Sequence, residues 1–193
     1  MNVLAIDTSS RYQTVCISAT DEGVLVHALL REGVAVSAAI PESLAALLSD
    51  APGAVVVVDG PGSYTGVRAG MAAALGVAHA RGLPLHTVGA LEVAAAGVPP
   101  GEQPCWVAAD AGRGAVYIAR LPGPHGRLTH VAVPRRVLAV SVQLDGLPVF
   151  SSDPLPLSGL TRLDPALSLA GAVPLALARA PVALRGLHAV YIS

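Results

Sequence analysis

The segment from Ala54 to Arg81 constrains the fold most, because an unbroken apolar run leads through a glycine-rich turn into a stretch of helical composition. The run "AVVVVD", residues 54–59, lacks polar alternation, as expected for a central strand of a parallel sheet that is covered on both faces. The turn "GPGSYTG" follows, and residues 66–81 hold only three polar side chains. A strand, a tight turn and a helix in this order predict an α/β fold.

The flanking segments predict further strands and helices from their apolar periodicity and their proline and glycine positions. We expect strands at residues 2–7, 12–20, 24–32 and 83–88, a short helix opened by Pro41 and Glu42, and a helix at 89–97. After residue 122 the periodicity is weak. There we expect one helix, over 165–179, kinked or interrupted near Pro174.

Clustered proline and glycine in residues 98–104 predict a boundary between two lobes. We expect an N-terminal lobe over 1–100 and a smaller C-terminal lobe over 101–193, with its final helix a candidate to pack back on the first lobe. An apolar strand that ends in Asp, a turn that carries Arg, and a second strand occur at Asp7 and again at Asp110. This repeat suggests a duplicated fold with a cleft between its halves, although a chance recurrence of so short a pattern stays open.

Charge and composition exclude several classes of protein. The formal net charge is −1, and the twelve basic residues, all arginine, are scattered except for Arg135 and Arg136, so no basic face for unaided nucleic-acid binding is expected. The sequence starts without a basic signal region, and no apolar run reaches about 20 residues, so we expect a cytoplasmic protein with no membrane contact. Cys16 and Cys105 lack CxxC spacing and are expected to be buried thiols, with a disulfide or metal site as the alternative.

The glycine-rich turn has two interpretations. Gly60, Gly62 and Gly66 form GxGxxxG, one residue longer than the dinucleotide fingerprint, and no GK[ST] follows. The turn is therefore either a structural corner, where Ser63 or Thr65 caps the helix, or an anion or nucleotide site.

The helix after this turn predicts a docking surface. Gly66, Gly70, Ala74 and Ala78 recur every four residues, and such a ridge of small residues lets another helix approach closely. We expect the opposite side to face the chain's own sheet and the ridge to meet a partner; cover by the chain's own first helix is the alternative. The predicted partner interface consists of Leu44, Leu47, Leu48, Gly70, Ala74 and Ala78.

Three motifs, "LAIDTS", "GPGSYTGVRAG" and "DAGRGAVYIA", closely resemble those of the bacterial TsaB (YeaZ) family in order and spacing over residues 1–120. The resemblance implies a two-lobed fold of the actin-like, Hsp70-like and sugar-kinase superfamily, with lobes of ribonuclease-H-like topology. It also implies a non-catalytic subunit that binds and activates a TsaD-like catalytic subunit in making threonylcarbamoyladenosine on tRNA. The expected partners are TsaD, a TsaE-like ATPase in the full complex, a second copy when the chain is alone, and tRNA only through the complex.

Active members of that superfamily hold magnesium on acidic strand ends and phosphate on an adjacent turn. Strand-end Asp residues followed by hydroxyl side chains fit this pattern here, and the alternative is that each Asp only caps its own turn. The candidate vestigial nucleotide or anion site comprises Asp7, Thr8, Ser9, Asp59, Gly62, Ser63 and Asp110. We expect no cofactor and no metal, with weak binding of ATP or ADP with magnesium as the alternative.

The sequence departs from the family pattern at two places. The first helix lacks the usual His-Ser pair, and the turn after Asp110 has Gly112 and Ala115 where the family usually has Arg and Glu. Family contacts made by those side chains cannot be transferred to this chain.

Two enzyme classes are the rivals. A small ATP-dependent phosphotransferase would share the fold, whereas a peptidase would need a metal or a nucleophile. The six histidines form no HExxH pair, and Ser63 lacks the flanking glycines of a GxSxG elbow. No catalytic residue is therefore predicted.

Overall fold

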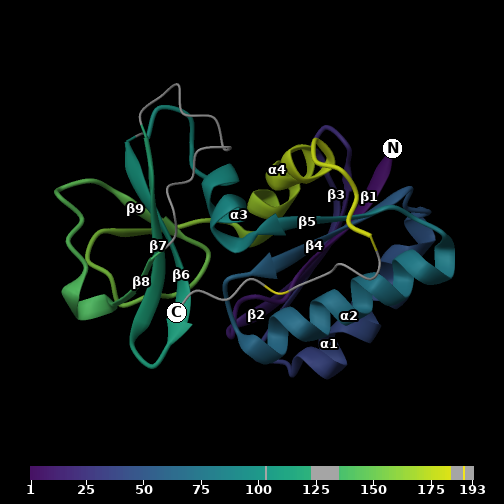
Figure 1. Ribbon diagram of the computed structural model, residues 1–193, viewed down its shortest axis with the longest axis horizontal. Helices are drawn as coiled ribbons and strands as arrows, with labels where there is room; N and C mark the ends of the chain where they lie inside the picture. Colours follow the sequence, from purple (N-terminus) through teal and green to yellow (C-terminus); the bar gives the residue numbers. More distant parts are fainter. Residues whose placement is uncertain (103, 123–134, 184–188, 190–193) are drawn as a thin grey trace.

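The computed structural model describes all residues except 103, 123–134, 184–188 and 190–193. It contains two five-stranded sheets, each in its own half of the molecule (Figure 1). Among the described residues, no helix has the length and apolar character needed to cross a membrane.

The first sheet has the strand order β3-β2-β1-β4-β5. β1, β2 and β3 are antiparallel neighbours, whereas β4 and β5 run parallel to β1. The apolar run that precedes the glycine-rich turn is β4, and its valines are fully buried between two helical layers. The strands are β1 (Asn2–Asp7), β2 (Gln13–Thr20), β3 (Leu25–Glu32), β4 (Ala54–Gly60) and β5 (Leu85–Gly89).

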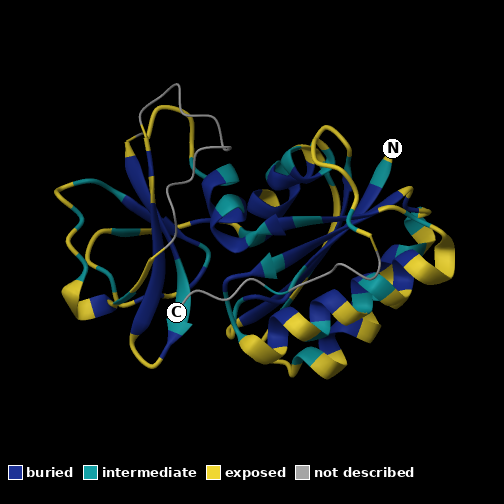
Figure 2. Cartoon of the chain, viewed as in Figure 1, coloured by how far each residue is buried: buried dark blue, intermediate teal, exposed yellow. Residues whose placement is uncertain are grey.

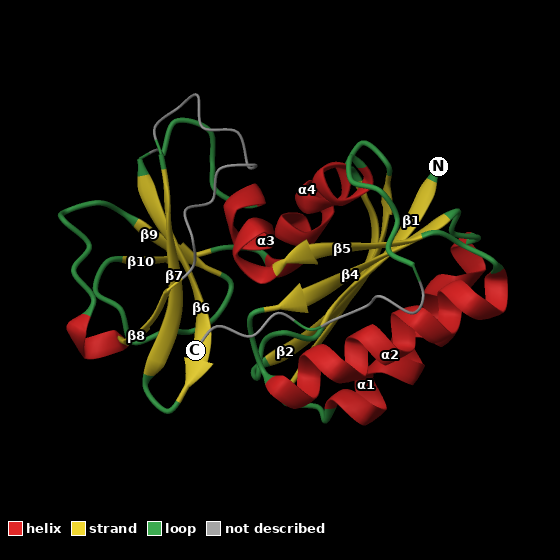
Figure 3. Cartoon of the chain, viewed as in Figure 1, coloured by secondary structure: helices red, strands yellow, loops and turns green. Residues whose placement is uncertain are grey.

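Helices cover both faces of this sheet (Figure 3). α1 (Val36–Leu47) and α2 (Tyr64–Arg81) pack on one face, while α4 (Pro165–Leu177) packs on the other. α3 (Ala90–Ala96) contributes side chains to the core beside α4 and also to the core of the second sheet, so it lies between the two halves.

The second sheet has the order β10-β9-β6-β7-β8, which repeats the first sheet's arrangement. In each sheet the central strand pairs antiparallel with the strand that follows it and parallel with a later one: β1 with β2 and β4, β6 with β7 and β9. The predicted α/β class with two ribonuclease-H-like lobes is confirmed. The strands are β6 (Cys105–Gly112), β7 (Ala115–Leu121), β8 (Arg135–Leu138), β9 (Val149–Ser151) and β10 (Leu160–Arg162).

The helices differ from the sequence prediction mainly at proline. α1 begins at Val36 and holds Pro41 inside it, whereas we expected Pro41 near the first position. The missing proline N–H removes one bond to the carbonyl of Ser37, and burial of Ile40 and Leu47 on the sheet offsets that loss. α4 is one helix from Pro165 to Leu177 with Pro174 inside it, so the expected interruption at Pro174 does not occur. The 3-10 turns Leu48–Asp50 and Ala139–Ser141 follow α1 and β8.

Both cysteines are buried and unpaired, as predicted. Burial raises the pKa of the Cys16 thiol to about 12 and that of Cys105 to about 11, because a thiolate would lose its hydration. Both side chains are therefore unreactive parts of the core.

Candidate functional site

The glycine-rich turn packs directly on the loop that follows β1. The hydroxyl of Thr8 donates to the carbonyl of Gly66 at 2.7 Å, and the N–H of Ser63 donates to the carbonyl of Ser9 at 2.7 Å. Ser63 is the N-cap of α2, and its Oγ accepts from the N–H of Gly66 at 3.3 Å. Two N–H groups at this helix end are thus bonded within the chain and are not directed at an anion.

Three glycines make this close crossing possible. A Cβ at Gly62 would collide with the carbonyl of Ser9, and one at Gly66 or Gly70 would collide with the carbonyl or hydroxyl of Thr8. In a phosphate loop the glycines leave room for the ligand. Here the chain's own residues 8 and 9 fill that room, so the geometry favours the structural corner.

The same packing corrects the predicted docking ridge. Gly70, Ala74 and Ala78 are buried against the chain's own sheet; Ala74 is 0% and Ala78 1% exposed, in a core with Leu4 and Val55. Side chains four positions apart differ by only about 40° in direction around a helix. The ridge therefore lies next to the apolar residues that we expected to face the sheet. The ridge and those residues form one buried face. Leu47 of α1 is also fully buried, and Leu44 of α1 and Leu48 of the following 3-10 turn pack partly against the same core.

The exposed side of α2 carries a second row of small residues. This outer stripe consists of Ala69, Ala72, Ala73, Gly76 and Ala80, which are exposed or half-buried. Exposed positions on α1 and α2 lie on the outer side of the molecule (Figure 2). At its N-terminal end Tyr64 is 59% exposed, and the Arg68 guanidinium lies 5.1 Å from the centre of its ring. Because its side chains are small and apolar, the outer stripe is a surface that another helix could approach closely.

The predicted anion-site residues divide into separate groups. Asp7 and Ser9 form a turn in which the N–H and hydroxyl of Ser9 both donate to Asp7 Oδ1, at 2.8 and 2.6 Å. Burial raises the pKa of Asp7, and these bonds partly counteract it. Asp110 lies across from this turn and pairs with Arg11, whose Nε is 2.5 Å from Oδ2. Within the described residues, no group of three or more His, Cys, Asp or Glu side chains is arranged to hold a metal ion.

Asp153 is a site residue that the sequence analysis missed. It is 5% exposed and accepts from the Ser10 hydroxyl at 2.6 Å and from the N–H of Asp110 at 2.9 Å. It follows β9, as Asp59 ends β4, so the duplicated topology could have pointed to it. The three-residue strand β9 was too short to be recognised from its sequence.

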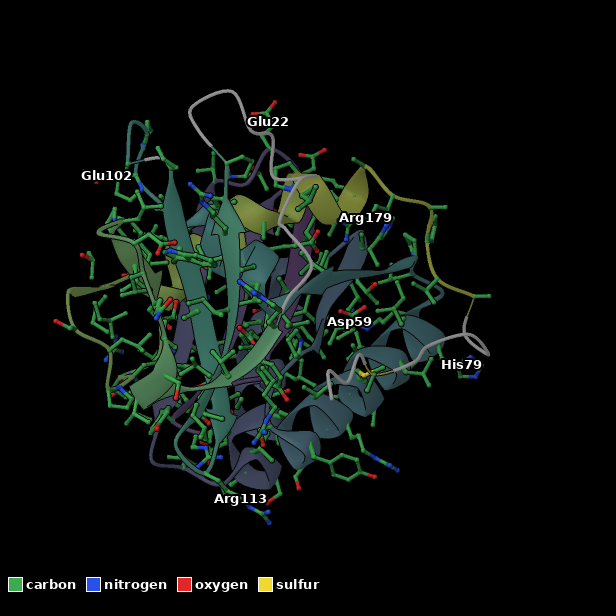
Figure 4. All side chains as sticks on the ribbon, turned by 60° about the vertical axis from the view of Figure 1, so that its left-hand side comes forward. Glu22, Asp59, His79, Glu102, Arg113 and Arg179 are labelled. Atoms are coloured by element: carbon green, nitrogen blue, oxygen red, sulfur yellow. The ribbon has the colours of Figure 1, made fainter. Side chains whose placement is uncertain are left out.

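Asp59 lies in a different environment from Asp7. Around it are Thr87, Glu92 and Arg179, and Glu92 forms a two-pronged ion pair with Arg179 at 2.5 and 3.0 Å. Asp59 and Arg179 come from the end of β4 and from the segment after α4 (Figure 4). Burial raises the pKa of Asp59 to about 6; the nearby Glu92 carboxylate adds to the rise, while the Thr87 hydroxyl and Arg179 counteract it.

This pKa makes stability depend on pH in a defined direction. Between the unfolded value of 3.8 and about 6, the folded state keeps a proton that the unfolded chain releases, so Asp59 lowers stability as pH rises through that window. We expect Asp59→Asn, which cannot ionise, to melt increasingly above the parent protein as pH is raised from about 4 to about 7. Parallel melting curves across that range check this. A constant difference would mean that the carboxyl is already ionised at about pH 4.

Comparison with known proteins places the chain in a family. The family model described as tRNA N6-adenosine threonylcarbamoyltransferase (TsaD) matches residues 35–144, more than half of the 193 residues. The chain belongs to this family. The matched residues run from the start of α1 through the second half of the first sheet and into the second lobe.

Two solved structures share the fold of this chain. YeaZ from Pseudomonas aeruginosa superposes with a TM-score of 0.73 at 24% identity over 99% of both chains. The ethanolamine utilization protein EutJ from Carboxydothermus hydrogenoformans gives a TM-score of 0.52 at 15% identity over 91% of this chain and 90% of EutJ. These likenesses establish the fold, and the predicted resemblance to the TsaB (YeaZ) family is confirmed.

A curated relative, an uncharacterized protein of Mycobacterium tuberculosis, is 38% identical over 125 residues, which are 61% of this chain. The matched segment spans 58% of the length of that relative.

Proposed function

We propose that this chain is a non-catalytic subunit that binds and activates a TsaD-like catalytic subunit in the formation of threonylcarbamoyladenosine on tRNA. The observation that carries the proposal is the outer stripe. α2 has already buried one face on the chain's own sheet, and it still presents a row of alanine and glycine to solvent. An exposed row of small apolar side chains is suited to close packing against a partner helix.

The packed corner supports a non-catalytic role. Residues 8 and 9 fill the space that the glycines leave. The N–H of Ser63 donates to the carbonyl of Ser9, and the N–H of Gly66 donates to Oγ of Ser63. A transferase that used this turn for phosphate would need those groups free for its ligand. The chemistry therefore belongs to the partner, and the second lobe and corner of this chain serve as a scaffold.

The assembly follows from the same surface. The chain alone uses its outer stripe to pair with a second copy, and the TsaD-like subunit displaces that copy. A TsaE-like ATPase joins the full complex, and tRNA is held through the complex, since a net charge of −1 provides no excess positive charge for RNA.

The experiment places a charge on the outer stripe. Ala72→Glu lies on exposed α2 surface, so the fold should be unchanged while a buried carboxylate at the contact opposes association. We expect at least about tenfold weaker binding to the catalytic subunit, which is purified separately and titrated in a calorimeter. The melting temperature of the variant should be unchanged. Ala180→Glu is the matched control, since Ala180 is also exposed but lies in the segment after α4 and not on α2.

Full binding by Ala72→Glu would remove the outer stripe as the contact surface. We expect no cofactor for the isolated chain. ATP with magnesium, bound by the isolated chain and turned over, would instead favour the phosphotransferase.

A further inference from the structure

Besides the apolar packing of α3, polar contacts from one short segment, residues 10–13 at the start of β2, join the two lobes. Arg11 pairs with Asp110 of β6 at 2.5 Å, and the hydroxyl of Ser10 donates to Asp153 Oδ1 at 2.6 Å. The amide of Gln13 donates to the carbonyl of Ser152 at 3.4 Å. Three of the four side chains in this segment, all except that of Tyr12, thus contact the second lobe.

Asp153 is the centre of this network on the second lobe. Its buried carboxylate accepts from Ser10 with one oxygen and from the N–H of Asp110 with the other, and its own N–H donates to the hydroxyl of Ser151 at 3.0 Å. A buried carboxylate is tolerated only where its oxygens are hydrogen-bonded. Ser10 therefore provides one of the bonds that this carboxylate needs, and it does so from the other lobe.

The Arg11 side chain also contacts the turn that follows Asp110. The position that a Cβ would take at Gly112 is occupied by the Arg11 guanidinium. The Arg11 side chain is 49% exposed and that of Asp110 is 13% exposed, so the ion pair lies at the solvent-facing edge of the contact between the lobes.

We propose that residues 10–13 form a clasp that holds the two lobes in one relative orientation. In this clasp Arg11 forms an ion pair with Asp110, and Asp153 accepts the hydrogen bond of Ser10. Arg11 therefore provides a positive charge from within the chain beside the carboxylates of Asp110 and Asp153. The clasp concerns the geometry of the chain itself, and it stands whether or not the proposed partner binds.

The test measures the separation of the lobes in the full-length protein. Spin labels are placed at Glu22→Cys in the first lobe and Arg120→Cys in the second, both exposed, while the native cysteines are buried and closed to labelling. In the parent we expect one narrow distance distribution. Arg11→Gln should broaden it and add a longer distance, because Asp110 loses its ion-pair partner and the lobes can then rotate about the contact through α3.

Arg31→Gln is the matched control, since Arg31 also pairs with a carboxylate, Glu42 at 3.8 Å, but within the first lobe. It should leave the distribution narrow. Ser10→Ala removes the second interlobe bond, from Ser10 to Asp153, and should act in the same direction as Arg11→Gln. A distribution that stays narrow in both Arg11→Gln and Ser10→Ala overturns the clasp, as does a parent distribution that is already broad.

Discussion

Gly66→Ala is expected to destabilise the protein severely, because the added methyl group would occupy the position of the Thr8 carbonyl. That carbonyl belongs to backbone that leads out of β1 and cannot move without disturbing the centre of the first sheet. The variant also shifts the carbonyl of Gly66 away from the Thr8 hydroxyl, a bond of 2.7 Å in the parent. Overpacking and the lost bond together should lower the free energy of unfolding by about 3 kcal/mol or more. Urea denaturation followed by circular dichroism measures this loss.

Gly76→Ala is the matched control in the same helix. A Cβ at Gly76 meets nothing within 4 Å, and the residue is exposed in the interior of α2. Alanine has the higher helix propensity, so this variant should gain about 0.5 to 1 kcal/mol. Equal effects of the two substitutions would mean that the helix does not cross the loop after β1 as closely as described.

Both glycines illustrate what a sequence can and cannot specify. The apolar run, turn and helix predicted a strand and a helix at the right places, because periodicity and composition are local properties. A glycine shows that some group comes close, but it does not identify the group. At Gly62 and Gly66 the alternatives were a phosphate and another part of the chain, and only the fold shows residues 8 and 9 there.

The two faces of α2 were harder to separate for a related reason. Alanine and glycine occur on both its buried and its exposed sides, so polarity does not mark the face toward solvent. For this reason the ridge that we expected to meet a partner lies on the buried side of α2. The clasp was beyond prediction because Ser10 and Asp153 are 143 positions apart in the sequence. The duplicated topology brings them together, and short strands after residue 122 concealed that topology.

Ala74→Glu provides the decisive check on which face of α2 is buried, since we expect this variant not to fold. Ala74 is 0% exposed and is surrounded by Leu4, Val55 and Met71, so a carboxylate there has no hydrogen-bonding partner and no path to water. A buried, unpaired charge costs several kcal/mol even after the carboxyl takes up a proton, which is a large part of the stability of a domain. Ala72→Glu, two residues away on the outer stripe, should fold like the parent. Circular dichroism and two-dimensional NMR spectra of the two variants distinguish these outcomes. If Ala74→Glu folds and Ala72→Glu does not, the assignment of the buried and exposed faces of α2 is wrong. The surface that we assign to the partner would then be wrong as well.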